Sequence, residues 1–366
     1  MIPGPYTALA ATHLPPSLLV TILTVSLLCA ACAMGRASVP KQGDTQAAPP
    51  GQPPTGPGSS QAPHAGVSKH QYGEGALGYW IYTPTQPVPA KAPVILYLHG
   101  WNGQNPFYYG GWIEHLVKRE NIVIFPVYQE SKRDEPERMI QNAIQGTKDA
   151  IERLEQSGPV QPELDKFAIV GHSLGGGLTA QIAARAEAAG LPVPKAIMPV
   201  EPGWRGGSDY PTAPLAKIPP STLMLVIVGD DDQFAKTRQA KPIFDLTKQI
   251  PPDHKRYIII QSDHHGTPPL IADHIAPHTP RDNYSLARTE RQKRWTEFII
   301  HMAGLRDGEE NALDYYGFWK LFDALCDAAF SGKTNIEAAL STARVGGMGV
   351  WSDGTPVKTW IETSNP

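Results

Sequence analysis

Short apolar runs alternate with amphipathic stretches along most of the chain. Uninterrupted apolar runs of strand length lie at residues 94–98, 122–127, 167–170, 196–200, 223–228 and 257–260, and residues 77–82 read as an earlier strand. Runs of this kind are typical of strands buried on both faces. Between them, residues 109–119 and 135–156 carry apolar side chains at helical spacing. The alternation predicts an α/β fold with an open, mostly parallel sheet and helices on both faces.

The pattern changes after the last of these runs. Residues 286–302 and 312–329 predict two helices, and the second carries an aromatic stripe that includes Phe318, Trp319 and Phe322. We expect this stripe to pack onto the sheet rather than to line a substrate site, because apolar stripes at helical spacing usually face a core. The tail predicts a turn at Ser352-Asp353-Gly354 and one short strand.

An uncharged segment of apolar and small residues spans residues 18–34. It is typical of a secretory signal peptide and is nearly long enough to anchor the chain in a membrane. We therefore expect residues 1–36 to direct export, with the protein either secreted or attached to a membrane through its N-terminus. Cleavage within Ala31-Cys32-Ala33 is one interpretation. The other is lipid attachment at Cys32, although Cys29 stands where a lipoprotein signal has Leu.

Composition divides the remaining chain into a linker and a domain. Residues 37–70 are rich in Pro, Gly, Gln, Ser and Ala, so they bury too little apolar surface to offset the entropy lost on ordering. They predict a disordered linker, and residues 71–366 predict the catalytic domain. The net charge is −3, and with no basic run we expect no nucleic-acid partner. Only Cys326 lies in the predicted domain, which excludes an internal disulfide and a site of several thiolates.

The most informative motif is Gly171-His172-Ser173-Leu174-Gly175. It follows a buried strand and precedes a helix-like stretch, which is the context that a G-x-S-x-G nucleophile elbow requires. Such a sharp turn needs small neighbours, and it presents the serine at a helix N-terminus, where developing negative charge is stabilised. Ser173 is therefore the candidate nucleophile, and His172 is expected to support the turn.

A serine nucleophile needs a histidine base and a carboxylate that orients it. Residues 228–232 end a strand and offer Asp230 and Asp232, and Glu201 ends the preceding strand. After the last strand, His264 and His265 are adjacent candidates for the base. Together with Asp263 and the later His274 and His278 they could also ligate zinc. However, no H-E-x-x-H spacing is present, so we expect no metal and no cofactor.

With these residues the chain resembles the α/β-hydrolase-fold serine hydrolases, nearest to dienelactone-hydrolase-like and polyester-hydrolase-like members, over roughly residues 72–302. The resemblance implies the chain order serine, acid, histidine. In this family the acid often ends a Gly-x-x-Asp turn, which selects Asp232. A small residue often follows the catalytic histidine, which selects His265 before Gly266. One departure is that a dienelactone hydrolase proper uses cysteine where this elbow has Ser173.

The resemblance also implies where the oxyanion would bind. Residues 99–103 follow a buried strand, and in this fold their loop supplies one backbone N–H to the oxyanion hole. That assigns the N–H of Trp101, together with the N–H of Leu174. Side chains expected near the substrate are Asn102, Phe107, Tyr108 and Trp204. The short stretch 203–222 leaves little room for a helical lid, so the site is expected to be open unless residues 267–281 cover it.

These features predict an exported hydrolase that cleaves small-molecule or polymeric carboxylic esters through an acyl-enzyme. The same triad chemistry would also serve an amide or peptide hydrolase or an acyltransferase. A non-catalytic, tethered binding protein with a hydrolase fold is a third reading, which the complete set of serine, acid and histidine disfavours.

Overall fold

The computed structural model describes residues 46–204, 213–284, 308–364 and 366. The predicted export segment, the first part of the predicted linker and the helix expected at 286–302 lie outside these residues. Residues Gln46–Pro366 form one compact unit. Within the part of the chain that is described, no helix is both long enough and apolar enough to cross a membrane.

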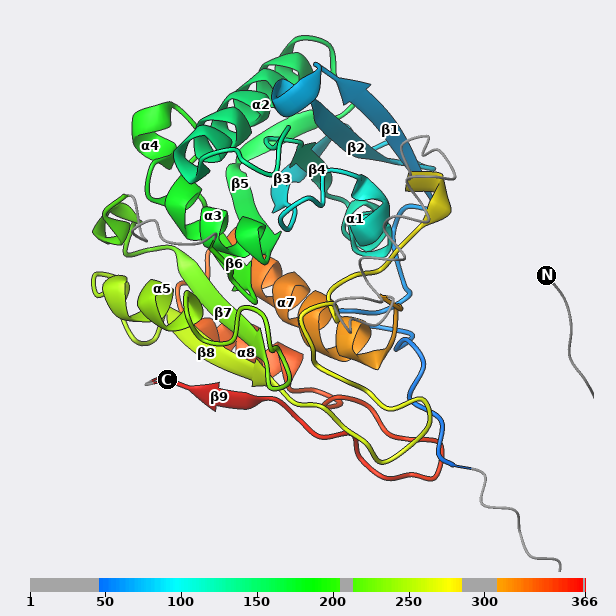
Figure 1. Cartoon of the computed structure of the whole chain (residues 1–366). Helices are drawn as coiled ribbons and strands as arrows, with labels where there is room; N and C mark the ends of the chain where they lie inside the picture. Colours follow the sequence, from blue (N-terminus) through cyan, green and yellow to red (C-terminus); the bar gives the residue numbers. More distant parts are fainter. Residues whose placement is uncertain (1–45, 205–212, 285–307, 365) are drawn as a thin grey trace, which may run out of the picture. The chain divides into compact units, whose positions relative to one another are not determined.

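One nine-stranded sheet organises this unit, in the spatial order β1-β2-β4-β3-β5-β6-β7-β8-β9 (Figure 1). The six strands from β3 to β8 run parallel, while β1, β2 and β9 pair antiparallel at the two ends. The strands are β1 (Gly66–Tyr72), β2 (Tyr79–Thr85), β3 (Lys91–Leu98), β4 (Ile122–Pro126), β5 (Gln161–His172), β6 (Ala196–Val200), β7 (Leu223–Gly229), β8 (Lys255–Ile260) and β9 (Ile361–Thr363). All the strands predicted from the apolar runs are present.

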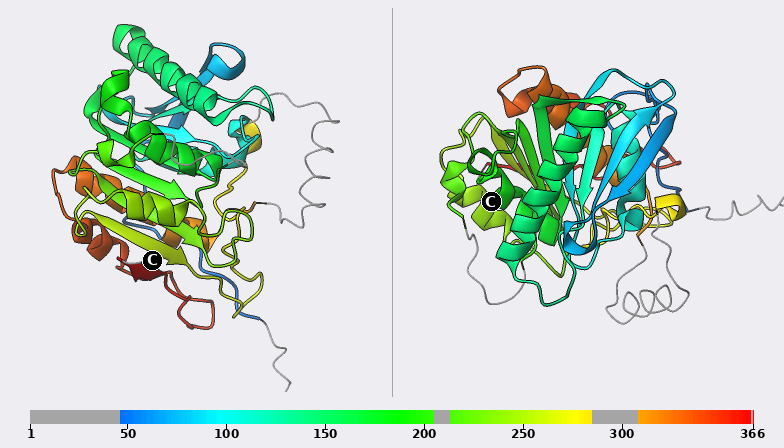
Figure 2. Two further views of the ribbon diagram at one scale, coloured as in Figure 1. Left: turned by 60° about the vertical axis from the view of Figure 1, so that its left-hand side comes forward. Right: turned by 90° about the horizontal axis from the view of Figure 1, so that it is seen from above.

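Helices cover both faces of the sheet (Figure 2). Side chains alternate along each strand, so Ile95 and Tyr97 of β3 enter one core while Leu96 and Leu98 enter the other. The first core is closed by α1 (Gly110–Lys118), α7 (Trp319–Phe330) and α8 (Ile336–Ala343). The second is closed by α2 (Pro136–Ser157), α3 (Leu174–Ala183), which a short α4 (Ala186–Ala189) follows, and α5 (Ala240–Leu246). This is the α/β architecture that the sequence predicts.

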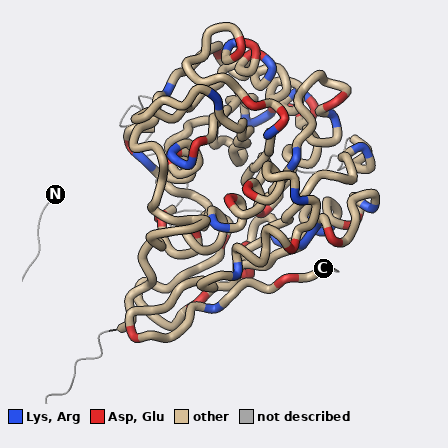
Figure 3. The backbone as a smooth tube through the Cα atoms, turned by 180° about the vertical axis from the view of Figure 1, so that it is seen from behind, with Lys and Arg blue, Asp and Glu red and all other residues tan. Residues whose placement is uncertain are grey.

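The aromatic stripe of the predicted helix at 312–329 is part of the first core, as expected. A π-helical turn, Asp314–Phe318, leads into α7, and Phe318, Trp319 and Phe322 are all buried. The apolar pattern did not predict β1, α5 or α8, which are short or mixed in polarity. In the tail the expected turn at residues 352–354 is present, and the short strand, β9, lies just beyond it at Ile361–Thr363. Lys, Arg, Asp and Glu are interspersed over the described body (Figure 3).

The structure corrects the prediction of a disordered linker, because residues 46–70 are part of the compact unit. Residues 66–70 belong to β1, which pairs with β2. Upstream, the Gly51 carbonyl accepts a hydrogen bond from the Tyr316 hydroxyl at 3.0 Å, and the Gly58 N–H donates to Asp323 at 2.7 Å. The Ala47 carbonyl accepts from Thr267 N–H at 2.8 Å. Proline and glycine suit such an irregular strap because its backbone polar groups are satisfied by the body rather than by a helix or sheet.

Asp323 is the point at which this strap meets α1 and α7. Its Oδ2 accepts from His115 Nε2 at 2.8 Å and lies 3.1 Å from Arg119 Nε. Burial alone would raise the pKa of Asp323, but His115 and Arg119 outweigh it and hold the pKa below its ordinary value. The buried carboxylate therefore fastens three segments that are distant in sequence.

Candidate active site

The strand-to-helix turn after β5 has the geometry of a nucleophile elbow. Ser173 stands between β5 and α3 with φ 55° and ψ −120°, a backbone conformation that non-glycine residues rarely adopt. A Cβ at Gly171 would lie 2.3 Å from the carbonyl oxygen of Gly175, and one at Gly175 would lie 2.2 Å from that of Leu98. Both glycines are therefore required for strand and helix to approach each other.

The Ser173 hydroxyl lies against a histidine and a carboxylate. His274 Nε2 is 2.9 Å from Ser173 Oγ, and His274 Nδ1 is 3.0 Å from Asp232 Oδ2. Since the carboxylate only accepts, Nδ1 donates to Asp232 and Nε2 accepts from the serine hydroxyl. Asp232 is buried, and its other oxygen accepts from the N–H groups of Phe234 and Ala235. The structure thus brings Ser173 and Asp232, two of the predicted site residues, to the same histidine.

The structure does not bring His265 to Ser173, so that assignment was wrong in its position. His265 Nε2 instead contacts Asp353 Oδ2 at 2.8 Å in the C-terminal turn, where both side chains are substantially exposed. His264, the alternative, is also exposed. Asp263, the third residue of the suggested zinc cluster, accepts from Trp351 Nε1 at 3.1 Å and from Lys358 N–H at 2.9 Å. Asp263 and His265 therefore hold the C-terminal segment.

The error arose from the length of the loop after β8. This loop first turns back on itself, with Asp263 and Leu270 paired as an isolated bridge, before it reaches His274. Asp230, the alternative acid, accepts from the backbone and hydroxyl of Ser262, and the Ser262 hydroxyl in turn accepts from Ala272 N–H at 2.9 Å. Local sequence rules place the histidine close to the strand end, whereas this hydrogen-bonded excursion moves it nine positions on. The site was expected to be open unless residues 267–281 covered it, and in the structure this segment carries the histidine itself.

The loop after β3 lies beside the serine, as the resemblance implies. A Cβ at Gly100 would be 3.3 Å from Ser173 Cβ, so the step into Trp101 passes directly by the nucleophile. Leu174 is the first residue of α3, and its N–H belongs to the free N-terminal turn of that helix. On the other side, a Cβ at Gly203 would come within 3.3 Å of Ser173 Oγ and 3.7 Å of Leu174 N. Glycine there keeps space open around the hydroxyl and the helix N-terminus.

The side chains expected near the substrate do not all lie beside Ser173. Trp101 is 45% exposed at the edge of the site. Asn102 adopts φ 63°, and its N–H donates to Gln129. Trp204 packs against α3 at Gly177. Phe107 and Tyr108 instead support the histidine loop, since their carbonyls accept from Arg281 and Thr279 N–H groups.

Phe234, which the sequence reasoning missed, and His278, which it named only as a possible metal ligand, complete the surroundings of His274. Phe234 is 53% exposed, and its ring stacks on the His274 ring with centroids 5.5 Å apart. His278 is partly buried and stands edge-on to Tyr109 and His172. The signal for Phe234 was an apolar residue two positions after the acid in an otherwise polar turn.

A buried hydrogen-bond chain joins the two loops of the site through His172. The Gly100 N–H donates to the Tyr109 hydroxyl at 2.8 Å, and that hydroxyl is 3.0 Å from His172 Nδ1. His172 Nε2 is 2.9 Å from the His274 carbonyl, to which it donates. Burial, and then the neighbouring His274, hold the pKa of His172 well below its usual range and bring that of His278 to about 3. Both rings are therefore neutral, and His172 supports the turn, as expected.

Glu201 lies behind these histidines. It follows β6 with φ 44°, is fully buried, and has no hydrogen-bond partner for either carboxyl oxygen among the described residues. Its Oε2 is 3.4 Å from His172 Nε2 and 3.7 Å from His274 Nδ1. The three side chains have donor atoms that suit zinc. However, both imidazole nitrogens already donate, to the His274 carbonyl and to Asp232, so a cation there would require both rings to give up these bonds.

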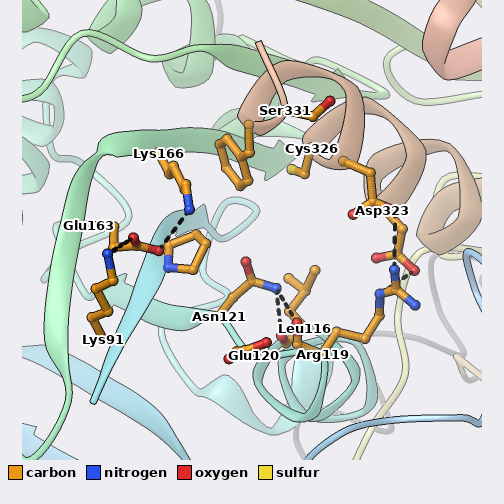
Figure 4. A pocket seen from close by; sticks show the side chains of 13 residues that line it. Lys91, Leu116, Arg119, Glu120, Asn121, Glu163, Lys166, Asp323, Cys326 and Ser331 are labelled. Carbon is orange, nitrogen blue, oxygen red and sulfur yellow. Dashed lines mark hydrogen bonds and ion pairs between the residues drawn. The ribbon is translucent and has the colours of Figure 1, made fainter. Parts of the chain in front are cut away.

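A pocket of about 410 Å³ lies at the opposite, amino end of the strands (Figure 4). Most of its charged side chains are paired with one another: Glu163 contacts Lys91 at 2.9 Å and Lys166 at 3.1 Å, and Arg119 contacts Asp323. Cys326 lines it, and burial raises the pKa of this thiol well above its ordinary value, which disfavours a thiolate nucleophile. The chemistry-bearing groups thus gather at the carboxyl ends of the strands, where ligands of such sheets bind.

Comparisons with known proteins relate the chain to ester hydrolases. The family model described as Chlorophyllase matches residues 63–213, a stretch that contains the elbow and ends before Asp232 and His274. Esterase LipI of Mycobacterium tuberculosis (strain ATCC 25618 / H37Rv) is 34% identical over 122 residues, which is 32% of this chain. The chain spans 37% of the length of that relative. The chain therefore has the α/β-hydrolase fold, and the comparisons support its resemblance to α/β-hydrolase esterases.

Proposed function

We propose that this chain hydrolyses carboxylic esters, with Ser173 as nucleophile, His274 as general base and Asp232 as the acid that orients the histidine. The observation that carries the proposal is the unbroken contact from Ser173 Oγ through His274 to Asp232, at 2.9 and 3.0 Å. The similarity to a chlorophyllase family model and to an esterase supports the same chemistry.

The reaction follows from which atom each proton can reach. Ser173 Oγ bonds to the ester carbonyl carbon while its proton passes to His274 Nε2, and the carbonyl oxygen becomes an oxyanion near the N–H groups of Leu174 and Trp101. The carbon–alkoxy bond then breaks, and the alcohol leaves with the proton from Nε2. Water attacks the acyl-enzyme with His274 again as base, which releases the acid and restores the Ser173 hydroxyl. Asp232 keeps the Nδ1 proton in place throughout.

The surroundings of Ser173 favour an apolar ester. The exposed rings of Trp101 and Phe234 stand on two loops of the site, and Phe234 stacks directly on the His274 ring. Exposed aromatic side chains beside a nucleophile gain stability by covering apolar substrate. We infer that the substrate is a small or polymeric ester with apolar groups near the scissile bond.

Labelling with a fluorophosphonate tests the nucleophile directly. Wild-type protein should be modified on Ser173 and should hydrolyse p-nitrophenyl esters. The Ser173→Ala variant should remain folded, resist labelling and lose roughly 10⁴- to 10⁶-fold in kcat/KM. Ester hydrolysis by this variant near the wild-type rate would refute the proposal. Parallel assays with p-nitroanilides distinguish ester hydrolysis from the alternative of amide cleavage, which the same groups could perform.

We also propose that the protein is exported, from the uncharged segment at residues 18–34. Mass spectrometry of the mature protein would distinguish the two forms of export. A diacylglyceryl group on Cys32 indicates a lipid anchor, and an unmodified terminus after Ala33 indicates secretion. An intact N-terminus in the cytosolic fraction would contradict both.

A further inference from the structure

A second carboxyl group lies within reach of the histidine of the proposed triad. Asp232 Oδ2 is 3.0 Å from His274 Nδ1, and Glu201 Oε2 is 3.7 Å from the same nitrogen. The two acids come from the ends of neighbouring parallel strands, Asp232 after β7 and Glu201 after β6. Both side chains are buried. Two carboxyl groups therefore face one imidazole N–H from adjacent positions.

The two acids differ in what surrounds them. Asp232 accepts from two backbone N–H groups as well as from His274. Glu201 has no hydrogen-bond partner among the described residues, although its own N–H donates to Ile227 at 2.7 Å. A buried carboxyl group without a partner costs stability, and Glu201 also occupies a left-handed backbone conformation that disfavours a large side chain. Packing alone gives no reason for an acid at this position.

The protonation of Glu201 follows from its environment. The titratable groups that face it are Tyr109, His172, Asp232, Asp273 and His274. Burial first, and then the charges of Asp232 and Asp273, raise the pKa of Glu201 well above its ordinary value. His172 is neutral and already donates to the His274 carbonyl, so it supplies no compensating charge. Glu201 is therefore the neutral acid of the pair, since two adjacent carboxylates repel each other.

We propose that Glu201 is a reserve positioning residue for His274: it shares a single negative charge with Asp232, and it accepts the hydrogen bond from the Nδ1–H of His274 when the Asp232 carboxylate is not available. This inference rests on the proposed function, because it assigns a role within the same triad. When Glu201 takes over from Asp232, it releases its proton to solvent, and its carboxylate accepts the hydrogen bond from Nδ1–H. Ser173, the substrate and the bonds that form and break are unchanged.

Four proteins test the proposal: wild type, Glu201→Leu, Asp232→Ala and the double variant. Apolar replacements are used at both positions because an amide at either one could donate to Nδ1 and fix the wrong imidazole tautomer. The measurement is kcat and KM for a p-nitrophenyl ester as a function of pH. Asp232→Ala should lose only about 10- to 100-fold in kcat and should gain a limb that rises with pH as Glu201 ionises. The double variant should lack that limb and lose about 10⁴-fold, the usual cost of a missing triad acid.

Asp231→Asn in the Asp232→Ala background is the matched control. Asp231 is an exposed acid of the same turn, and its removal should leave the rising limb in place. Equal kcat and equal pH profiles for Asp232→Ala and the double variant would overturn the proposal. If Ser173→Ala retained activity, the triad itself would be refuted, so the two failures are distinguishable.

Infrared spectroscopy provides a second measurement that does not depend on the folding of Asp232→Ala. At neutral pH, the wild type should show carbonyl bands of protonated carboxylic acids, and Glu201→Leu should remove one of them. Asp314, a buried acid far along the sequence whose pKa burial also raises, should keep its band in both proteins. Identical spectra would mean that Glu201 is ionised, and the shared-charge proposal would fail.

Discussion

Buried carboxyl groups have opposite surroundings at the two ends of the parallel strands, here called the amino edge and the carboxyl edge of the sheet. At the amino edge, Asp323 is ionised and contacts His115, Arg119 and the Gly58 N–H. At the carboxyl edge, Glu201 has no hydrogen-bond partner among the described residues and lies between two histidines. Pairing lowers the pKa of Asp323, whereas burial raises that of Glu201.

This difference distinguishes a buried carboxyl group that stabilises the fold from one that serves the chemistry of a site. A buried carboxylate whose partners are fixed contributes to the position of the segments that it joins, and removing a partner leaves a charge stranded. A buried acid without partners costs stability, and such groups concentrate at functional sites. The comparison predicts that substitutions at the amino edge alter unfolding, while substitutions at the carboxyl edge alter turnover.

The largest effect is expected from the histidine at the carboxyl edge. His274→Ala removes the only histidine in contact with Ser173 Oγ among the described residues, so kcat/KM should fall roughly 10⁴- to 10⁶-fold with little change in the unfolding midpoint. The control is His265→Ala, which removes an exposed contact with Asp353 and should leave kcat/KM within about 2-fold. The reverse result, with His265 essential and His274 dispensable, would contradict the geometry.

The next effect is expected at the amino edge. Asp323→Asn removes the buried carboxylate that pairs with His115 and Arg119, and the free energy of unfolding should fall by about 3–5 kcal/mol. Chemical denaturation measures this loss, and kcat per folded molecule should stay unchanged. Asp327→Asn is the matched control, because Asp327 contacts the same arginine at 3.4 Å with a 60% exposed side chain and should cost under about 1 kcal/mol. A large loss of turnover in folded Asp323→Asn would break the comparison.

The smallest effect is a difference in acid sensitivity between the edges. His172 and His278 have lowered pKa values in the folded state. Their contribution to the free energy of unfolding is complete above a pH of about 6.5, the ordinary pKa of histidine in the unfolded chain. It is lost as the pH falls, because the unfolded chain binds protons that the folded chain does not accept until about pH 3 at His278. The contribution of Asp323 to the free energy of unfolding is complete above about pH 3.9, the ordinary pKa of aspartate in the unfolded chain. It is lost only as the pH falls further.

Hydrogen exchange as a function of pH measures this order. Amides around the histidine loop should lose protection between about pH 6.5 and 4, before those of α7. His278→Gln should flatten the pH dependence of the unfolding free energy in that interval. Simultaneous loss of protection at both edges near pH 4 would show that the histidines are not the sensitive groups.

The fold and the nucleophile elbow of the site follow from local sequence. Apolar runs bounded by amphipathic stretches suffice to predict β3 to β8 with α1 and α2, because burial on both faces leaves a continuous apolar signature. The elbow is equally local, since the close approaches at Gly171 and Gly175 require glycine whatever the rest of the chain does. The end of β7 limited the acid to a few candidates, Asp230 and Asp232 foremost, and the resemblance to α/β-hydrolases selected Asp232.

Tertiary structure alone decided the rest. His274 could not be chosen from the sequence, because its position depends on the Asp263–Leu270 bridge and on the contact of Ser262 with Asp230. The strap at residues 46–65 was read as a linker, because composition reports how much apolar surface a segment can bury but not which partners its backbone will find. The juxtaposition of Glu201 with His274 likewise exists only once β6 and β7 pair side by side. Contacts between residues far apart in the chain leave no periodicity or motif in the sequence, so only folding determines them.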